Sequence, residues 1–151
     1  MRTESLAAAL EQEHHEIDEG IAAFMAAPGD RLPLIRALRA LRRHIYLEEE
    51  ILFPLLHQAD PAVAAPVFVM LREHGRIWDL LGTLELLGND AAGLAVTRQL
   101  TSHLLHHNLK EERILYPFAD EALPAAEAER LRAFIDTGDL PDGWACFKAR
   151  S

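Results

Sequence analysis

Two copies of one segment rich in histidine and glutamate stand out in this sequence. Residues 44–54 read HIYLEEEILFP, and residues 107–117 read HNLKEERILYP. A shorter repeat precedes each copy, EHHEI at 13–17 and EHGRI at 73–77. Imidazole nitrogens and carboxylate oxygens are ligands that suit iron, manganese or zinc. Repeated residues of these types inside apolar segments predict a metal site with two-fold pseudosymmetry.

The spacing within each copy places particular side chains on one face of a helix. Four residues advance an α-helix by about 400°, so Glu48 lies nearly over His44. Glu49 is rotated by about 140° from that histidine and is expected to face solvent. The second copy repeats this arrangement with His107, Glu111 and Glu112.

The shorter repeats add one histidine each, His14 and His74, at positions within apolar stripes of their helices. Four imidazoles and two carboxylates would then converge on one interior. Since a carboxylate has two oxygens, it can lie between two cations, and we expect Glu48 and Glu111 to meet in the middle of the molecule at a dinuclear centre. The predicted metal ligands are His14, His44, Glu48, His74, His107 and Glu111.

Other polar residues near these positions are assigned secondary roles. His103 lies one turn before His107 and is a possible additional ligand. Tyr46 and Tyr116 are expected to pack or to lie at the surface, although a tyrosine beside a metal pair can act as a redox partner. A solvated helix face is expected for the acidic run Glu11, Glu13, Glu16, Asp18 and Glu19.

The elements that must carry these residues are predicted to be helices. Ala, Leu, Glu and Arg dominate, the apolar residues recur every three to four positions, and strand-type alternation is absent. Turn signals occur at 28–30, 58–61 and 88–93. They predict an up-down-up-down four-helix bundle with a short fifth helix and an irregular tail. The predicted helices span 3–26, 32–58, 62–87, 92–120 and 124–136.

Two domains or parts are expected, a bundle over 1–120 and a C-terminal helix and tail over 121–151 packed on it. Trp144 and Phe147 are expected to pack on the bundle. Pro54 and Pro117 fall inside helical patterns, where each lacks a backbone donor and crowds the carbonyl four residues earlier. A kink or a frayed helix end is therefore predicted at both.

Composition limits the classes of function. The chain has 151 residues, a formal net charge of −9 and one cysteine. An acidic chain repels phosphate backbones, so nucleic-acid binding is not expected. No apolar run approaches the roughly 18 residues of a membrane span, and a signal peptide is not evident. The expected location is the cytoplasm.

The two motifs resemble those of the hemerythrin-like family, also called the HHE cation-binding domain, over residues 10–118. The resemblance implies a four-helix bundle holding two iron ions in an oxo- or hydroxo-bridged centre, with Glu48 and Glu111 as bridging ligands and the four histidines as terminal ligands. Zinc or manganese are possible substitutes. Oxygen-carrying members have a further histidine one turn after the third-helix ligand, where this chain has Trp78. This difference favours small-molecule chemistry or sensing over a carrier.

The function predicted on this basis is the binding or sensing of a small diatomic ligand, dioxygen or nitric oxide. One alternative is a di-iron enzyme acting on dioxygen, peroxide or nitric oxide, including the type that repairs iron–sulfur clusters. Another is a structural metal-binding bundle. The sequence assigns no catalytic residue and leaves the oligomeric state open.

Overall fold

A computed structural model describes residues 4–150, which are helical along most of their length. Two long rods are each built from two α-helices joined by a π-helical segment. The elements are α1 (Leu6–Ala26), α2 (Leu32–Leu47), π-helical η1 (Glu48–Leu52), α3 (Phe53–Ala59), 3₁₀-helical η2 (Pro61–Val63), α4 (Ala64–Leu86), α5 (Ala91–Lys110), π-helical η3 (Glu111–Leu115), α6 (Tyr116–Ala122), α7 (Ala125–Thr137) and 3₁₀-helical η4 (Phe147–Arg150).

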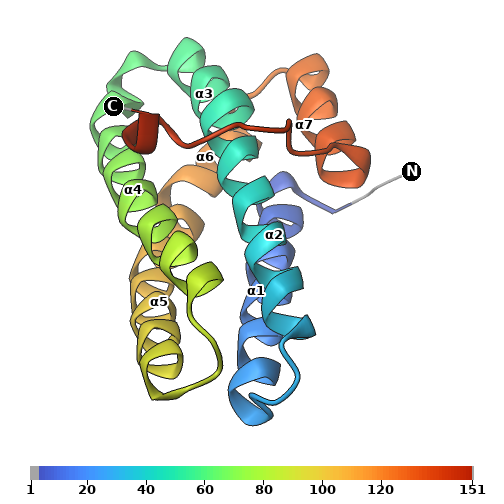
Figure 1. Cartoon of the computed structure of the whole chain (residues 1–151). Helices are drawn as coiled ribbons and strands as arrows, with labels where there is room; N and C mark the ends of the chain where they lie inside the picture. The colour runs from blue at the N-terminus through green and yellow to red at the C-terminus, as the bar shows by residue number, and fades with distance from the viewer. Residues whose placement is uncertain (1–3, 151) are drawn as a thin grey trace.

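The helices form an all-α bundle, which confirms the predicted fold class. α1, the α2–α3 rod, α4 and the α5–α6 rod run up and down beside one another, and α7 lies outside them in contact with α1 (Figure 1). The described part of the chain contains no strand. The expected helix start at residue 3 lies outside the described residues; the described helix begins at Leu6, after a Ser5 hydroxyl that accepts from Ala8 N–H.

The two prolines lie just after π-helical turns. η1 ends one residue before Phe53, whose N–H donates to the carbonyl of Glu48, five residues earlier. In η3 the N–H of Tyr116 likewise donates to the carbonyl of Glu111. Such i→i+5 bonding adds a residue to the turn and is frequent at functional sites. Each predicted kink is thus a widened turn, followed by Pro54 or Pro117 at the start of the next helix.

The core has two apolar layers with a polar layer between them. One layer contains Leu6 and Leu10 of α1, and the other contains Ile17 and Ile21. His14 lies between these pairs in the sequence and is buried. On α4 and on the α2–α3 and α5–α6 rods, buried polar residues likewise lie between the two apolar layers. The bundle therefore has a buried polar layer at mid-height. The residues of that layer are His14, His44, Glu48, Glu49, His74, His107 and Glu111.

The C-terminal part crosses one face of the bundle. After α7 the chain runs over the α2–α3 rod and ends beside α4 (Figure 1). Trp144 packs edge-on against Tyr46 and Trp78, with ring centroids 5.1 and 5.4 Å apart. Trp144 therefore packs on the bundle as expected. Phe147, which was also expected to pack there, is 55% exposed.

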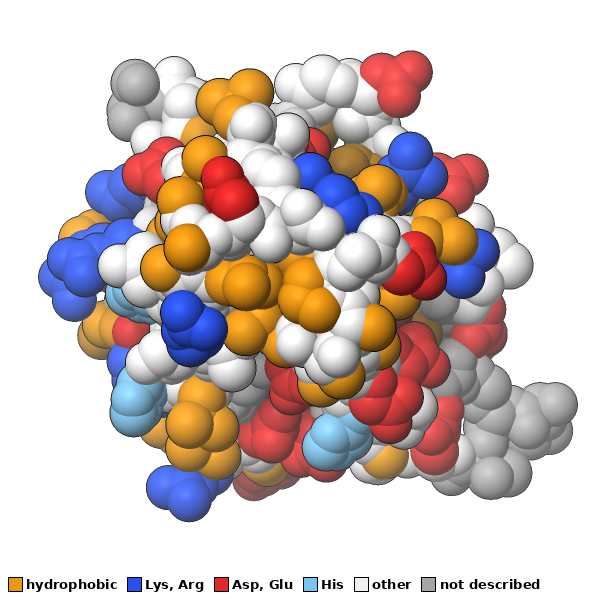
Figure 2. Space-filling view, turned by 60° about the horizontal axis from the view of Figure 1, so that its bottom comes forward, with side chains coloured by type: hydrophobic (Ala, Val, Ile, Leu, Met, Phe, Trp, Pro, Cys, Tyr) orange, Lys and Arg blue, Asp and Glu red, His pale blue; other side chains and the backbone are white. Residues whose placement is uncertain are grey.

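The surface combines charge with scattered apolar side chains. From the end that carries the α1–α2 and α4–α5 turns, hydrophobic side chains gather mid-face and acidic ones gather beside them (Figure 2). Exposed large hydrophobic residues include Leu32, Ile35 and Leu86. Among the described residues, no helix has the length and apolar character that crossing a membrane requires.

Candidate metal centre

The six predicted ligands meet in the polar layer, where they form two groups of four that share both glutamates. In each group the candidate ligand atoms all lie within 4.8 Å of one another. The carboxylates of Glu48 and Glu111 meet there as expected, and both are fully buried. The first group is His14, His44, Glu48 and Glu111, and the second is Glu48, His74, His107 and Glu111.

Each shared glutamate offers one oxygen to each group. Glu48 Oε2 lies 3.3 Å from His44 Nε2, and its Oε1 lies 3.0 Å from His74 Nε2. Glu111 Oε1 lies 3.2 Å from His14 Nε2, and its Oε2 lies 3.2 Å from His107 Nε2. Every histidine therefore turns Nε2 toward the shared carboxylates. This arrangement suits two cations that lie side by side between the glutamates.

The other nitrogen of each ring contacts a second carboxylate at 2.6 to 2.8 Å. A carboxylate that accepts a hydrogen bond from Nδ1–H fixes the ring and leaves a lone pair on Nε2, as is usual for metal-binding histidines. The pairs are His14 with Glu112, His44 with Glu13, His74 with Glu49 and His107 with Glu73.

These outer carboxylates follow the sequence repeat. Glu13 and Glu73, which precede the histidines of the short repeats, each hold the second histidine of their own repeat. Glu49 and Glu112 each hold the first histidine of the other repeat. The repeats are therefore interlocked through hydrogen bonds as well as through the shared glutamates.

The expectation that Glu49 and Glu112 face solvent was wrong. Glu49 is buried and Glu112 is half-buried, and both reach a histidine. Each glutamate pair begins a π-helical segment, in which a turn holds more residues and each residue advances by a smaller angle than in an α-helix. Two consecutive glutamates therefore both fit on the inner side of the rod.

Glu13 is a further correction, because it does not belong to a merely solvated face. Its carboxylate accepts from His44 Nδ1 and from Arg43, whose Nη1 lies 2.9 Å away. Burial by itself would raise the pKa of Glu13, but His44 and Arg43 outweigh it and lower that pKa. The ionised carboxylate is thus favoured where it accepts hydrogen bonds from His44 and Arg43.

Tyr116 is the residue that sequence reasoning misplaced. Its side chain is fully buried, and its hydroxyl lies 2.9 Å from both His14 Nε2 and His44 Nε2. The same hydroxyl is 2.7 Å from Glu48 Oε2 and 3.1 Å from Glu111 Oε1. The i→i+5 bond of η3 sets Tyr116 over Glu111. An α-helical projection cannot find this, although the aromatic-proline pair after each EE motif could have drawn attention to it.

In the metal-free cluster, the surrounding carboxylates raise the pKa values of three histidines. Burial alone would lower the pKa of His107, but Glu111, Glu73 and Glu48 together raise it to about 10. The pKa values of His44 and His74 are also raised, against the effect of burial, by neighbouring glutamates. Without a cation, these three imidazoles therefore hold a proton more readily than a free imidazole does.

Two observations test whether a cation fits here. Glu111 Oε2 is buried and makes no hydrogen bond, although His107 Nε2 lies 3.2 Å away, and a buried carboxylate oxygen without a hydrogen bond is costly. His14 Nε2 and His44 Nε2 face each other at 3.1 Å, while both Nδ1 atoms point to carboxylates. When both rings are neutral and donate from Nδ1, the two Nε2 lone pairs oppose each other, and a cation between them removes that repulsion. The donor set is the mixture of imidazole and carboxylate that iron, manganese and zinc accept.

His103 does not join the cluster. Its side chain is exposed and lines a surface pocket of about 240 Å³ together with Glu73 and His106. The buried stripe of α5 passes through Leu104 instead, because a step of four residues from His107 rotates by about 40° and carries His103 to the α4 side.

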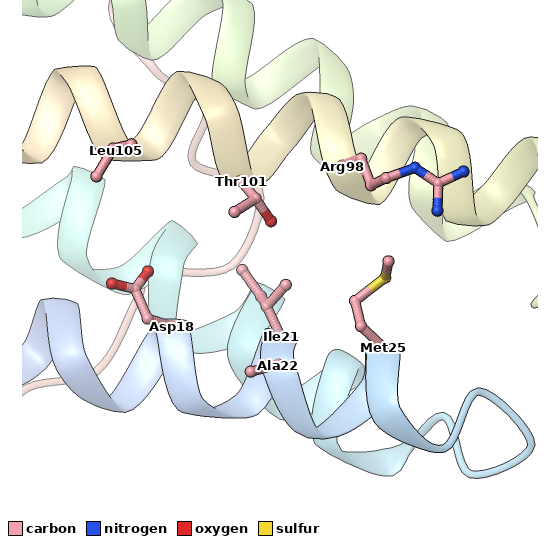
Figure 3. Close-up of a pocket in the computed structure, with 7 residues that line it drawn as sticks. All are labelled: Asp18, Ile21, Ala22, Met25, Arg98, Thr101 and Leu105. Carbon is pink, nitrogen blue, oxygen red and sulfur yellow. The ribbon is translucent and has the colours of Figure 1, made fainter.

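A separate groove lies between α1 and α5. Asp18, Ile21 and Met25 approach it from α1, and Arg98, Thr101 and Leu105 approach it from α5 (Figure 3). Its volume is about 470 Å³. None of its lining residues belongs to the cluster, and Ile21 is part of the neighbouring apolar layer. The groove therefore contributes no ligand atom to the candidate centre.

Comparison with known proteins identifies the family of the segment that contains the cluster. Residues 5–119 match the family described as the hemerythrin HHE cation binding domain. No curated protein and no solved structure matches the chain. The matched range includes all six candidate ligands, the four outer carboxylates and Tyr116.

Proposed function

We propose that this chain, which belongs to the hemerythrin HHE cation-binding family, holds two iron ions and uses them to bind or sense dioxygen or nitric oxide in the cytoplasm. His14 and His44 would hold one ion, and His74 and His107 the other. Glu48 and Glu111 would be shared by both.

One observation carries this proposal, namely that both shared carboxylates direct one oxygen to each pair of histidines. A single closed tetrahedral ion, the usual arrangement of structural zinc, would use only four of these six residues. Two ions give every buried lone pair a partner. A pair of iron ions would supply the electrons with which a diatomic molecule can be bound or reduced.

The residues around the ligands would orient the imidazoles and keep water away from the ions. The outer carboxylates hold the Nδ1–H groups, and so keep the imidazoles turned toward the ions. The apolar layers above and below exclude water, which strengthens the electrostatic contacts inside. Both contributions favour tight metal binding.

Metal analysis with optical spectroscopy tests the proposal. Freshly purified protein should contain about two iron ions per chain, and the ferrous form should give a new visible absorption on exposure to dioxygen or nitric oxide. His44→Ala and His107→Ala should lower iron content and thermal stability together. About one zinc and no iron per chain would support the structural alternative. Sustained turnover that Glu48→Ala abolishes would support the enzyme.

A further inference from the structure

The Tyr116 hydroxyl has an environment that a phenol alone does not explain. Four polar atoms surround it within 3.1 Å, two histidine Nε2 atoms and two carboxylate oxygens. A phenol donates one hydrogen bond. The carboxylates only accept, and in a neutral imidazole that donates from Nδ1 the Nε2 atom is an acceptor as well. The hydroxyl therefore satisfies one of these four neighbours, at the 2.7 Å contact with Glu48.

The distances match those between neighbouring ligands of one metal ion. Nitrogen and oxygen ligands lie ~2.1 Å from a transition metal such as zinc, so two ligands at right angles are about 3 Å apart. The phenol oxygen is 2.7 to 3.1 Å from each of the four other atoms. His14 Nε2 and His44 Nε2 are 3.1 Å from each other. Five donor atoms are thus gathered at ligand spacing.

We propose that the Tyr116 oxygen is a fifth ligand to the ion held by His14, His44, Glu48 and Glu111, and that the ion held by His74 and His107 has no such ligand. This inference rests on the proposed di-iron function. On coordination the phenol O–H bond breaks, an oxygen–iron bond forms and the proton leaves to solvent. A cation beside Glu48 and Glu111 favours this loss.

The repeat explains why the two halves differ. Tyr116 aligns with Phe53, since the copies end in ILYP and ILFP. Both residues follow a π-helical turn, and both are buried. The Phe53 ring stacks on His74, with centroids 5.8 Å apart and planes at 14°, and it carries no oxygen. The half with Tyr116 is therefore more completely coordinated, and an exogenous ligand should bind at the half with Phe53.

The test uses the protein loaded with two equivalents of ferrous iron and oxidised to the ferric form. A tyrosine oxygen on ferric iron gives a visible charge-transfer band, and Raman excitation within that band enhances phenolate ring vibrations. The chain has two tyrosines, Tyr46 and Tyr116. Tyr46 packs on Phe134 and Trp144, and serves as the matched control. The band and vibrations should survive Tyr46→Phe and disappear in Tyr116→Phe.

A second measurement covers the case in which Tyr116→Phe fails to fold or to retain iron. Tyr46→Phe protein made with ring-deuterated tyrosine carries one labelled tyrosine, Tyr116, so an isotope shift of the enhanced vibrations would assign them to it. Iron-loaded protein without these vibrations would overturn the inference and leave the di-iron proposal intact. Vibrations that persist in Tyr116→Phe would also overturn it. Failure of the unaltered chain to take up iron would overturn both proposals.

Discussion

Each histidine of the centre is held at both ring nitrogens, and the outer contact decides where the inner one points. His74, for example, is fully buried between Glu49 at Nδ1 and Glu48 at Nε2. Loss of the outer carboxylate would free the ring to rotate and lower the basicity of Nε2. The outer glutamates should therefore matter for affinity almost as much as the ligands.

Glu49→Ala and Glu112→Ala should each weaken iron binding by about 10- to 100-fold, because these side chains orient His74 and His14. Competition with a chromophoric chelator would measure this change. Glu50→Ala is the control, since Glu50 belongs to the same EEE run but is exposed. Equal affinities for Glu49→Ala and Glu50→Ala would contradict the assigned hydrogen bond.

The six candidate ligands could be predicted from sequence because i, i+4 spacing and apolar stripes hold along the α-helical parts. Glu49, Glu112 and Tyr116 could not be placed in this way. Their positions depend on π-helical turns, which the sequence indicates only through the prolines that follow them. The rotation of about 100° per residue in an α-helix does not hold across a π-helical turn. Side-chain directions projected with that angle are therefore wrong for the residues in and just after the turn, which lie beside the site.

Among the elements, α1 and α6 are joined by hydrogen bonds at the start of α1. The Asp120 carboxylate of α6 accepts from the N–H groups of Leu6 and Ala7, at 2.7 and 3.1 Å. These donors belong to the first turn of α1 and have no partner within their own helix. A carboxylate there is also favoured by the helix dipole.

Asp120→Ala should therefore lower the free energy of unfolding by about 1 kcal/mol, the usual cost of losing a helix cap. Urea denaturation of the metal-free protein at neutral pH would measure it. Glu121→Ala, one residue along on the exposed side of α6, should leave the midpoint nearly unchanged. The interpretation fails if the two variants are destabilised equally.

For the whole molecule, the boundaries of the main helices agree with the turn signals to within a few residues, since glycine, proline and aspartate mark the chain reversals. The path of the tail did not follow from sequence. It depends on single long-range contacts, such as the N–H of Phe147 donating to Glu49 at 2.8 Å and Arg43 donating to the carbonyl of Gly138. No periodic pattern encodes contacts of this kind.

Metal-free protein should lose stability as the solution becomes alkaline. The pKa of His107 is raised from 6.5 to about 10, so its contribution is fully present below pH 6.5 and is lost as pH rises through 10. The loss should be on the order of a few kcal/mol, measured by urea unfolding of chelator-treated protein at several pH values. His107→Gln should flatten the slope; an unchanged slope would refute the assignment.

Acid should also lower the stability of the protein, but through Glu73, whose contribution is lost as the pH falls. Hydrogen bonds from His107, offset in part by burial, lower the pKa of Glu73 from 4.5 to about 2, and Lys110 contributes to the shift. Its stabilisation is present above pH 4.5 and declines as pH falls toward 2. Protons also compete for the histidines, so iron should dissociate as pH falls, with protons released on rebinding. Glu73→Gln should raise the pH at which half the iron is lost.

The interlocked repeats limit what either half of the chain could hold by itself. A half-length chain ending near Asp60 would carry His14 and His44 but would lack the carboxylate that holds His14, which comes from the other half. It could complete the set only as a symmetric homodimer, with each copy lending that group to its twin. The two identical subunits of such a homodimer must carry the same aromatic residue after the π-helical turn. A single polypeptide that carries both halves is free of that constraint, so it can have a phenol on one side and a plain phenyl ring on the other.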